Sequence, residues 1–497
     1  MTDRSFRRRR ASLAVALAIA TMATGCSFIP AHERPPAPIP AAYPASSQGA
    51  PGTTKADAPA PADVAWQDFF GDERLRRLIQ IALDNNRDLR VAVLNVEQAR
   101  AAFQIRRADL FPTVNVGAQA TRSYTPSTLS VTGAPLLYNT LGASVGITSY
   151  ELDLFGRVRA LKDQALAQFF ATEENRKAAQ ISLVASVANA YLAIVADDEL
   201  LRLTEQTLST RDESFRLSKL RFDNGVASEV DLRQAETLVE AARASMVALR
   251  RQRQLDENTL VLLLGQELPA DLPPSQALGE QTMLAEVPPG LPSDLLVRRP
   301  DIRAQEQQLV SAEANIGAAR AAFFPRIALT GSFGFGSREL NQLFEGSSRQ
   351  WSIGPALSVP IFDGGRNRAT LESARVQRDI MVAEYEKTIQ SAFKEVSDAL
   401  AGSATLGDQL SALRAQAEAE AQRLKLADLR YRGGASSYLD LLDAQRSLYT
   451  VQQSVIQTQL AQLQARVTLY RALGGGWQEP MVASAESPAP ARTRISQ

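Results

Sequence analysis

The chain contains the same phrase twice. Residues 220–236 read LRFDNGVASEVDLRQAE and residues 429–445 read LRYRGGASSYLDLLDAQ, and the two align without a gap. The match is longer than the phrase, because residues 157–265 align with residues 366–474 at the same spacing. A period of about 210 residues is too long for a solenoid repeat. The chain therefore consists of two fused homologous halves, and each half must fold into the same elements.

The duplication divides the chain into segments. We predict a first structural repeat over residues 63–268 and a second over residues 301–476. The Pro-rich segment 269–300 joins them. The tail 477–497 is rich in Ala, Ser and Pro, a composition typical of disorder.

The N-terminus has the features of an export signal. Residues 1–25 begin with a basic stretch and continue with an apolar run of about fifteen residues, too short to span a bilayer. The run ends at Gly25-Cys26 behind small residues, which resembles a bacterial lipobox and predicts lipidation of Cys26. An ordinary signal peptide followed by a free cysteine is the alternative. Residues 26–62 are Pro- and Ala-rich and predict an extended, lipidated tether.

Composition excludes several classes of function. The 54 basic and 54 acidic residues cancel, so nothing favours a nucleic-acid partner. One His and one Cys are too few for a catalytic triad or a His-based metal site. A nucleotide-binding P-loop is absent, and Asp363-Gly-Gly-Arg366 resembles a turn between a strand and a helix. An all-carboxylate site is the alternative, but most acidic residues lie in helical patterns that favour a solvated face. We therefore expect no catalytic residue, no metal and no cofactor.

Long helices occupy much of each half. In residues 438–472, Leu442, Tyr449, Ile456 and Leu463 recur every seven residues, which is the apolar seam of a coiled coil. Residues 157–219 form a nearly unbroken helical pattern of about sixty residues, or about 90 Å. Helices of this length predict an elongated assembly.

The repeated phrase is the turn of a helical hairpin. A Gly at the end of each helix can adopt the left-handed conformation, and a Ser followed three residues later by Asp can cap the next helix. The predicted turn residues are Gly225, Ser228 and Asp231 in the first half and Gly434, Ser437 and Asp440 in the second.

Four short segments alternate in polarity with a period of two. They cover about residues 113–121, 143–152, 326–336 and 351–359. Their length suits tilted strands that span a membrane, although strands of a soluble sheet alternate in the same way. If they span a membrane the sheet must close, and four strands per chain cannot close a barrel. Two chains would give eight strands and three would give twelve; physics alone does not choose.

A family resemblance favours three chains over two. The motifs are WQDFFGD at Trp66, SYELDLFGRVR at Ser149, VRRPDIRAQE at Val297, GSFGFGS at Gly331, VPIFDGGRNRA at Val359 and the ending ALGGGW. In this order they resemble the NodT-type outer-membrane lipoproteins of tripartite efflux pumps, in the TolC superfamily. The resemblance implies a mixed, mainly α fold. It implies a homotrimer with a twelve-stranded transmembrane β-barrel, a long α-helical barrel and a small α/β equatorial region.

The same resemblance implies a gate at the periplasmic tip of the tunnel. By motif its residues are Leu439, Asp443 and Arg446. The aligned residues of the first half are Val230, Gln234 and Thr237, which carry no charge. The alternative is that Asp443 and Arg446 form an ordinary ion pair on a helix surface.

The predicted function is that of an outer-membrane exit duct for drugs or other small toxic compounds. Its implied partners are a periplasmic adaptor and an inner-membrane transporter of the RND type, besides outer-membrane lipid. A periplasmic coiled-coil adaptor or scaffold lipoprotein, a duct for type I protein secretion and a secreted enzyme are the alternatives.

Overall fold

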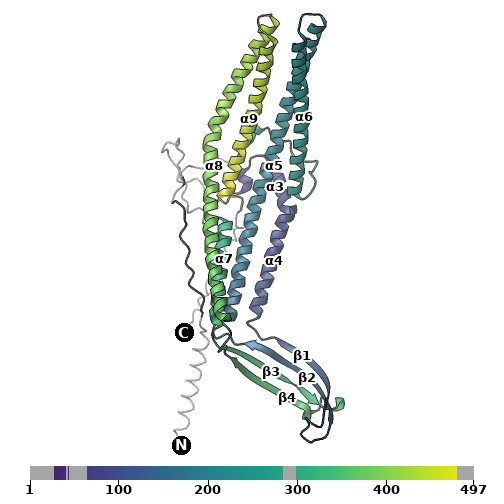
Figure 1. The fold of residues 1–497 in the computed structure, drawn as a ribbon, viewed down its shortest axis with the longest axis vertical. Coiled ribbons are helices and arrows are strands. Elements are labelled where there is room, and N and C mark those ends of the chain that lie inside the picture. Colours follow the sequence, from purple (N-terminus) through teal and green to yellow (C-terminus); the bar gives the residue numbers. More distant parts are fainter. Residues whose placement is uncertain (1–26, 41–42, 44–63, 284–297, 478–497) are drawn as a thin grey trace, which may run out of the picture. The chain divides into compact units, whose positions relative to one another are not determined.

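The computed structural model describes residues 27–40, 43, 64–283 and 298–477. These residues are mainly helical and include one four-stranded sheet, as Figure 1 shows. The predictions for the signal peptide, for Cys26, for most of the tether and for the tail lie outside the described residues.

The duplication is visible in the lengths of the helices. The helices are α2 (Trp66–Phe69), α3 (Glu73–Asn85), α4 (Arg87–Ala108), α5 (Arg157–Asp223), α6 (Glu229–Leu264), α7 (Pro300–Ala321), α8 (Arg366–Arg432) and α9 (Tyr438–Ala472). Helices α5 and α8 each have 67 residues, and α4 and α7 each have 22. Helices α6 and α9 have 36 and 35 residues. The predicted fold class, mainly helical and internally duplicated, is confirmed.

The chain forms two compact units, and each unit draws on both repeats. Of the described residues, unit 1 takes those within Met1–Ala37, Val93–Glu174 and Asp301–Thr388, and unit 2 takes those within Pro38–Ala92, Asn175–Pro300 and Ile389–Gln497. The sequence repeats therefore do not coincide with the structural units, because the strands of both halves pack together in unit 1. The helical hairpins of both halves meet in unit 2.

The sheet of unit 1 is antiparallel throughout. Its strands are β1 (Val114–Thr125), β2 (Leu136–Glu151), β3 (Arg326–Ser337) and β4 (Arg349–Ser358). They lie side by side in chain order, so β1 and β4 are the two edge strands (Figure 1).

The first two strands are longer than their predictions. Alternation predicted a strand over about 143–152, but β2 begins at Leu136 because residues 136–142 continue the ladder with β1. Strand β1 likewise extends to Thr125, which lies opposite Leu136. Residues 136–142 read LLYNTLG, in which apolar and polar residues do not alternate regularly. Alternation therefore does not predict this part of β2.

The first described residues lie along α7 in unit 1. The contacts are a ring stack of Phe28 on Phe324 at 4.6 Å, a hydrogen bond between His32 and Glu313 at 2.9 Å and a bidentate pair of Arg34 with Glu306 at 2.8 and 2.9 Å. The sequence predicted a tether in this region. Residues 28–34 are extended, but specific contacts fix them to a helix, and a Pro-rich composition alone gave no sign of those contacts.

The core of unit 2 includes the short N-terminal helices. Phe69 of α2 stacks on Tyr470 of α9 with ring centroids 3.9 Å apart. Asp72 caps α3 and accepts hydrogen bonds from the Tyr191 hydroxyl at 2.7 Å and from Gln281 Nε2 at 2.8 Å. Buried carboxylates need such partners. Of the expected α/β equatorial region, the described residues contain α2, α3 and one bridge pair that joins Phe70 and Met283.

Helix α5 contains one window of 18 residues, with a mean hydropathy of 1.7, that is apolar enough to cross a membrane. Of that window, 56% is buried inside the protein. Val187 and Leu192 of α5 are fully buried in the core of unit 2. Packing within the protein therefore accounts for the apolar character of this helix.

Candidate functional site

The sheet has one apolar and one polar face. Residues that lie opposite one another in an antiparallel ladder point to the same side, so the register assigns each position to a face. The apolar face carries Val114, Val116, Ala118, Ala120, Leu141, Ala143, Val145, Ile147, Ile327, Leu329, Phe333, Phe335, Trp351, Ile353 and Leu357. The polar face carries Asn115, Gln119, Thr121, Ser123, Thr140, Ser144, Thr330, Ser332, Gln350, Ser352 and the glycines 117, 142, 146, 334, 336 and 354.

None of the elements that the structure describes covers the apolar face. Val116 is 86% exposed, Trp351 75% and Leu357 67%. An apolar patch of this extent is not stable in water and marks a contact with lipid or protein. Within the described residues the outer edges of β1 and β4 are unpaired, and an open edge has backbone groups without partners. On its own the sheet is therefore incomplete.

The apolar face has the height of a bilayer core. Val114 and Tyr124 both lie on it, ten residues apart (114 to 124), which is about 33 Å along a strand. A tilt of about 40° reduces this to about 25 Å, the height of the apolar band in membrane barrels. Arg122 and Arg349 lie on the same face, both close to the end of the sheet where the strand-connecting loops begin.

Within the four described strands, the polar face has charged side chains only at the end where the strands join the helices. They are Glu151 and Arg326, which form an ion pair at 2.8 Å. Glu151 also binds Arg157 at 2.7 Å. Between this pair and the loops, the polar face consists of uncharged and mostly small residues.

In unit 2, both helical hairpins have the same turn. Gly225 has a φ of 72° and Gly434 a φ of 71°, in the left-handed region that favours glycine. In the first turn the Val226 N–H donates to the Arg221 carbonyl and the Gly225 N–H to the Phe222 carbonyl, both at 2.9 Å. This pattern is a Schellman motif, which satisfies the last carbonyls of a helix. The second turn repeats it around Gly434.

The next helix of each hairpin begins at a serine. The Ser228 hydroxyl accepts a hydrogen bond from the Asp231 N–H at 3.1 Å, and the Asp231 carboxylate accepts one from the Ser228 N–H, which completes a capping box. Ser437 accepts from the Asp440 N–H at 3.3 Å. Each predicted turn residue thus lies in a turn or at a cap.

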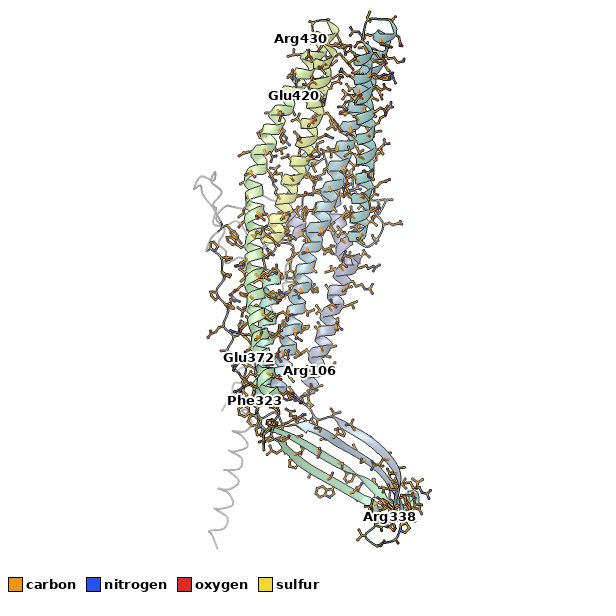
Figure 2. All side chains as sticks on the ribbon, in the orientation of Figure 1. Arg106, Phe323, Arg338, Glu372, Glu420 and Arg430 are labelled. Atoms are coloured by element: carbon orange, nitrogen blue, oxygen red, sulfur yellow. The ribbon has the colours of Figure 1, made fainter. Side chains whose placement is uncertain are left out.

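The carboxylate of Asp443 lies between two guanidinium groups. Arg446, three residues on, is 3.0 Å away, and Arg423 of α8 contacts the other carboxylate oxygen. The two arginines, Arg423 foremost, lower the pKa of Asp443. Arg423 also binds Glu420, which Figure 2 labels on α8. Sequence reasoning identified Asp443 and Arg446 but missed Arg423.

The two hairpins differ in charge at the positions that correspond to Asp443 and Arg423. Leu439 of the second hairpin is 56% exposed, and its counterpart Val230 in the first is 64% exposed. Arg423 aligns with Ser214 of α5, in the first half, just as Asp443 aligns with Gln234. The charged cluster therefore occurs in one of the two hairpins.

A groove of about 750 Å³ lies below the tips, between α5, α8 and α9 of unit 2. Leu217, Tyr431 and Tyr438 give it an apolar part, and Lys425 and Asp428 give it a charged rim. A partner helix with an apolar stripe and charged flanks would fit such a surface. In the part of the chain that the structure describes, no cluster of His, Cys, Asp and Glu suits a metal ion.

Asp197 of α5 is a buried carboxyl group that lies against Asp256 of α6. Asp197 is buried, with 7% of its surface exposed, and its Oδ2 atom has no hydrogen-bond partner. Burial, followed by a hydrogen bond to Asp256, raises its pKa to about 7. The adjacent Asp198 is instead paired with Arg253 at 2.6 Å.

Replacement of Asp197 by Asn should remove a pH dependence of stability. Folding raises the pKa of Asp197. Its contribution to the free energy of unfolding is therefore fully present below about pH 4 and is lost as the pH rises to about 7. Asp197→Asn should therefore raise the thermal midpoint of the helical region at pH 8 more than at pH 5, measured by circular dichroism in detergent. Asp198→Asn is the neighbouring control and should change the pH dependence less than Asp197→Asn, since the charge of Asp198 raises the pKa of Asp197 less than burial and Asp256 do. An unchanged pH dependence in Asp197→Asn would contradict the assignment.

Comparison with known proteins identifies the family. The family described as outer membrane efflux protein matches residues 78–266 and 291–475, once in each half of the chain. The chain belongs to this family. The predicted resemblance to NodT-type outer-membrane proteins of the TolC superfamily is thus confirmed, and the chain is an outer-membrane channel protein of an efflux system.

Individual members of the efflux family resemble the chain over almost its full length. The toluene efflux pump outer membrane protein TtgC of Pseudomonas putida is 48% identical over 455 residues, 92% of this chain and 93% of TtgC. The antibiotic efflux pump outer membrane protein ArpC of Pseudomonas putida has the same identity and coverage. The open-state structure of the MtrE outer membrane channel of Neisseria gonorrhoeae has a TM-score of 0.82 and 39% identity, and the match covers 91% of this chain and 98% of MtrE.

These matches decide between the alternatives for the class of protein. The outer membrane efflux proteins are channels and not a family of enzymes, and they are the outer-membrane component of the pump. The predicted exit duct is therefore confirmed over a periplasmic adaptor.

Proposed function

We propose that three copies of this chain form one gated channel, in which each copy supplies four strands of a twelve-stranded barrel. The observation that carries the proposal is the sheet of unit 1, with its exposed apolar face and two unpaired edges. In a bilayer an open edge leaves backbone groups unsatisfied, so the sheet must close with other copies. Antiparallel strands β1 and β4 can pair with each other around a ring.

The residues of the polar face favour three copies over two. Two copies would make an eight-stranded barrel, whose interior is just wide enough for side chains to fill. Glycines occupy positions 117, 142, 146, 334, 336 and 354 on this face and leave such an interior empty. A wider barrel of twelve strands has a water-filled lumen and needs small polar residues on its wall.

The two faces set the orientation of the barrel. The apolar face, with Leu329 and Phe333, contacts lipid, and the polar face lines the lumen. A Cβ atom at Gly146 or Gly334 would overlap the backbone of the neighbouring strand on the polar side. This crowding supports a sheet that is concave toward the lumen.

At the tip of the second hairpin, Leu439, Asp443 and Arg446 form the gate in this proposal, together with Arg423. The three copies of Asp443 approach one another near the three-fold axis, where like charges repel. In each copy Arg423 and Arg446 neutralise the carboxylate through charge-assisted hydrogen bonds. The closed tip thus depends on three copies of a modest interaction. A partner that binds the open form better can shift this balance.

The channel conducts without catalysis, and its energy comes from partners. A periplasmic adaptor with helical hairpins would bind the groove between α5, α8 and α9, and an RND-type transporter in the inner membrane would supply the substrates. The names of TtgC and ArpC refer to toluene and antibiotics. Small apolar or amphipathic compounds are accordingly the substrate class that we propose. Type I protein secretion has no comparable support.

Loss of the protein should raise the accumulation of such compounds in the cell. A strain without this gene should accumulate several times more of a lipophilic fluorescent dye than its parent, because the pump then lacks its exit. Expression of the intact protein should restore efflux, and a variant with a blocked lumen, Gly117→Trp, should not, because Gly117 lies on the polar face with open space around it. Equal accumulation with and without the protein would contradict the proposed function.

Lipidation of Cys26 remains a proposal, supported by the small residues that precede it. Labelled palmitate should be incorporated into the mature protein, and Cys26→Ala should abolish the label. One acyl chain anchors a protein weakly, so the barrel should still insert in the variant. A persistent label in Cys26→Ala would exclude this cysteine as the modified residue.

A further inference from the structure

The loop between β4 and α8 exposes two large apolar side chains. Ile361 is 96% exposed and Phe362 is 92% exposed. The loop is nevertheless ordered, since the Asp363 carboxylate accepts hydrogen bonds from the N–H groups of Gly365 and Asn367, both at 2.9 Å. The Asn367 side chain in turn donates to the Ala322 carbonyl at 3.1 Å. The turn thus holds Ile361 and Phe362 outward from their own chain.

A second exposed apolar group lies at the opposite edge of the sheet. Phe111, just before β1, is 65% exposed, and Val114 and Val116 at the start of β1 are 62% and 86% exposed. Phe111 is also fixed in place, because its N–H donates to the Ala108 carbonyl at 2.9 Å. Each edge of the sheet therefore has an exposed aromatic ring at the end where the strands join the helices.

The direction of the strands brings these two groups together in a closed barrel. Strand β1 starts at Val114 at the helical end of the sheet, and β4 finishes at Ser358 at the same end. If the free edge of β4 pairs with β1 of the next copy, the end of β4 meets the start of that β1. The residues that follow β4 then lie beside the residues that precede β1.

We propose that Ile361 and Phe362 of one copy pack against Phe111 of the next copy and seal the seam between subunits where the barrel joins the helices. This inference rests on the shared barrel proposed above and names the residues through which the copies recognise one another. A second copy is favoured over lipid as the occupant, since the loop directly follows an edge strand whose backbone needs the same neighbour. Exposed aromatic rings at such a seam act as anchors in protein interfaces.

Cysteine pairs in the full-length protein test the contact. In Phe111→Cys/Phe362→Cys, mild oxidation in membranes should link most chains into covalent dimers and trimers that thiol reduces to monomers. In Phe111→Cys/Phe344→Cys, no linkage should form, because Phe344 is also exposed, at 69%, but lies in the loop at the other end of β3. Linkage in neither pair, in a protein that still forms conducting trimers, would overturn the inference and leave the channel function standing. Loss of trimers in the reduced parent would instead refute the shared barrel.

Two further measurements separate the possible occupants. Phe362→Asp should lower the fraction of trimer that survives in detergent at least several-fold. Val131→Asp, at a fully exposed position in the loop between β1 and β2, should not. A tryptophan introduced by Phe362→Trp, in a Trp351→Phe background, should resist quenching by brominated lipid. Strong quenching of that tryptophan would show that lipid covers the loop and would contradict the proposed contact.

Discussion

Leu329→Arg should abolish assembly of the channel in the outer membrane, whereas Thr330→Arg should be tolerated. The two residues are neighbours in β3, but the register places Leu329 on the apolar face opposite Pro355 and Thr330 on the polar face opposite Gly354. An arginine toward lipid costs up to about 2–4 kcal/mol per chain at the bilayer midplane. Three copies in one barrel multiply this cost, so the expected total reaches about 6–12 kcal/mol. An arginine in a wide, watery lumen carries no such cost.

The matched pair can be measured as heat-modifiable trimer in isolated outer membranes. Thr330→Arg should give close to the wild-type amount, and Leu329→Arg should leave the chain monomeric or degraded. Equal assembly of the two variants would mean that the apolar face does not meet lipid. The reverse result, with Thr330→Arg alone defective, would invert the proposed orientation.

The second large effect is expected at the tip. Asp443→Ala with Arg446→Ala should open the channel without unfolding it, because the pair lies on a helix surface where both side chains are partly exposed. Three neutralised carboxylates are lost together, and each remaining Arg423 loses one of its two acidic partners and keeps only Glu420. Open probability in planar bilayers should rise by about tenfold, as expected when several modest interactions are removed from a two-state equilibrium.

Two controls make this test specific to the charged cluster. Gln234→Ala with Thr237→Ala changes the aligned positions of the first hairpin and should leave the current close to that of the parent. Arg423→Ala alone should give an intermediate effect, since Arg446 still neutralises Asp443. If the Asp443/Arg446 variant conducts like the parent, the pair is an ordinary surface ion pair and the constriction lies elsewhere.

Local signals in the sequence were sufficient for the helical hairpins. A left-handed glycine, a capping serine and an aspartate three residues later act within one turn of chain, so Gly225, Ser228 and Asp231 could be read without knowledge of packing. The long helices were predictable for the same reason, because a seven-residue apolar repeat persists over many turns.

Contacts between distant segments were not accessible to the same reasoning. Arg423 is twenty residues from Asp443 (423 to 443) and reaches it only because α8 and α9 fold back on each other. The turn at Gly434 offered a signal, since the two residues lie eleven and nine positions from it, and such positions face each other in a hairpin. The hydrogen bond of Asp197 with Asp256 across α5 and α6 had no comparable local sign.

The sheet illustrates both situations. Alternation located four strands, but it could not tell which face meets lipid, since either side of an isolated strand is possible. The ladder places Leu329 on one apolar face with Ile353 and Leu357, and Thr330 on the other, polar face with Ser352, which supports the proposed orientation. Alternation also failed over residues 136–142, where pairing with β1 and not side-chain polarity defines the strand.

The mass of the intact assembly tests the central claim most directly. Native mass spectrometry of the purified protein, released from detergent micelles, counts the chains that share one barrel. We predict a single species of three mature chains, because four strands per chain and a lumen wall rich in glycine favour a barrel of twelve strands. A folded species of one or two chains would contradict the account.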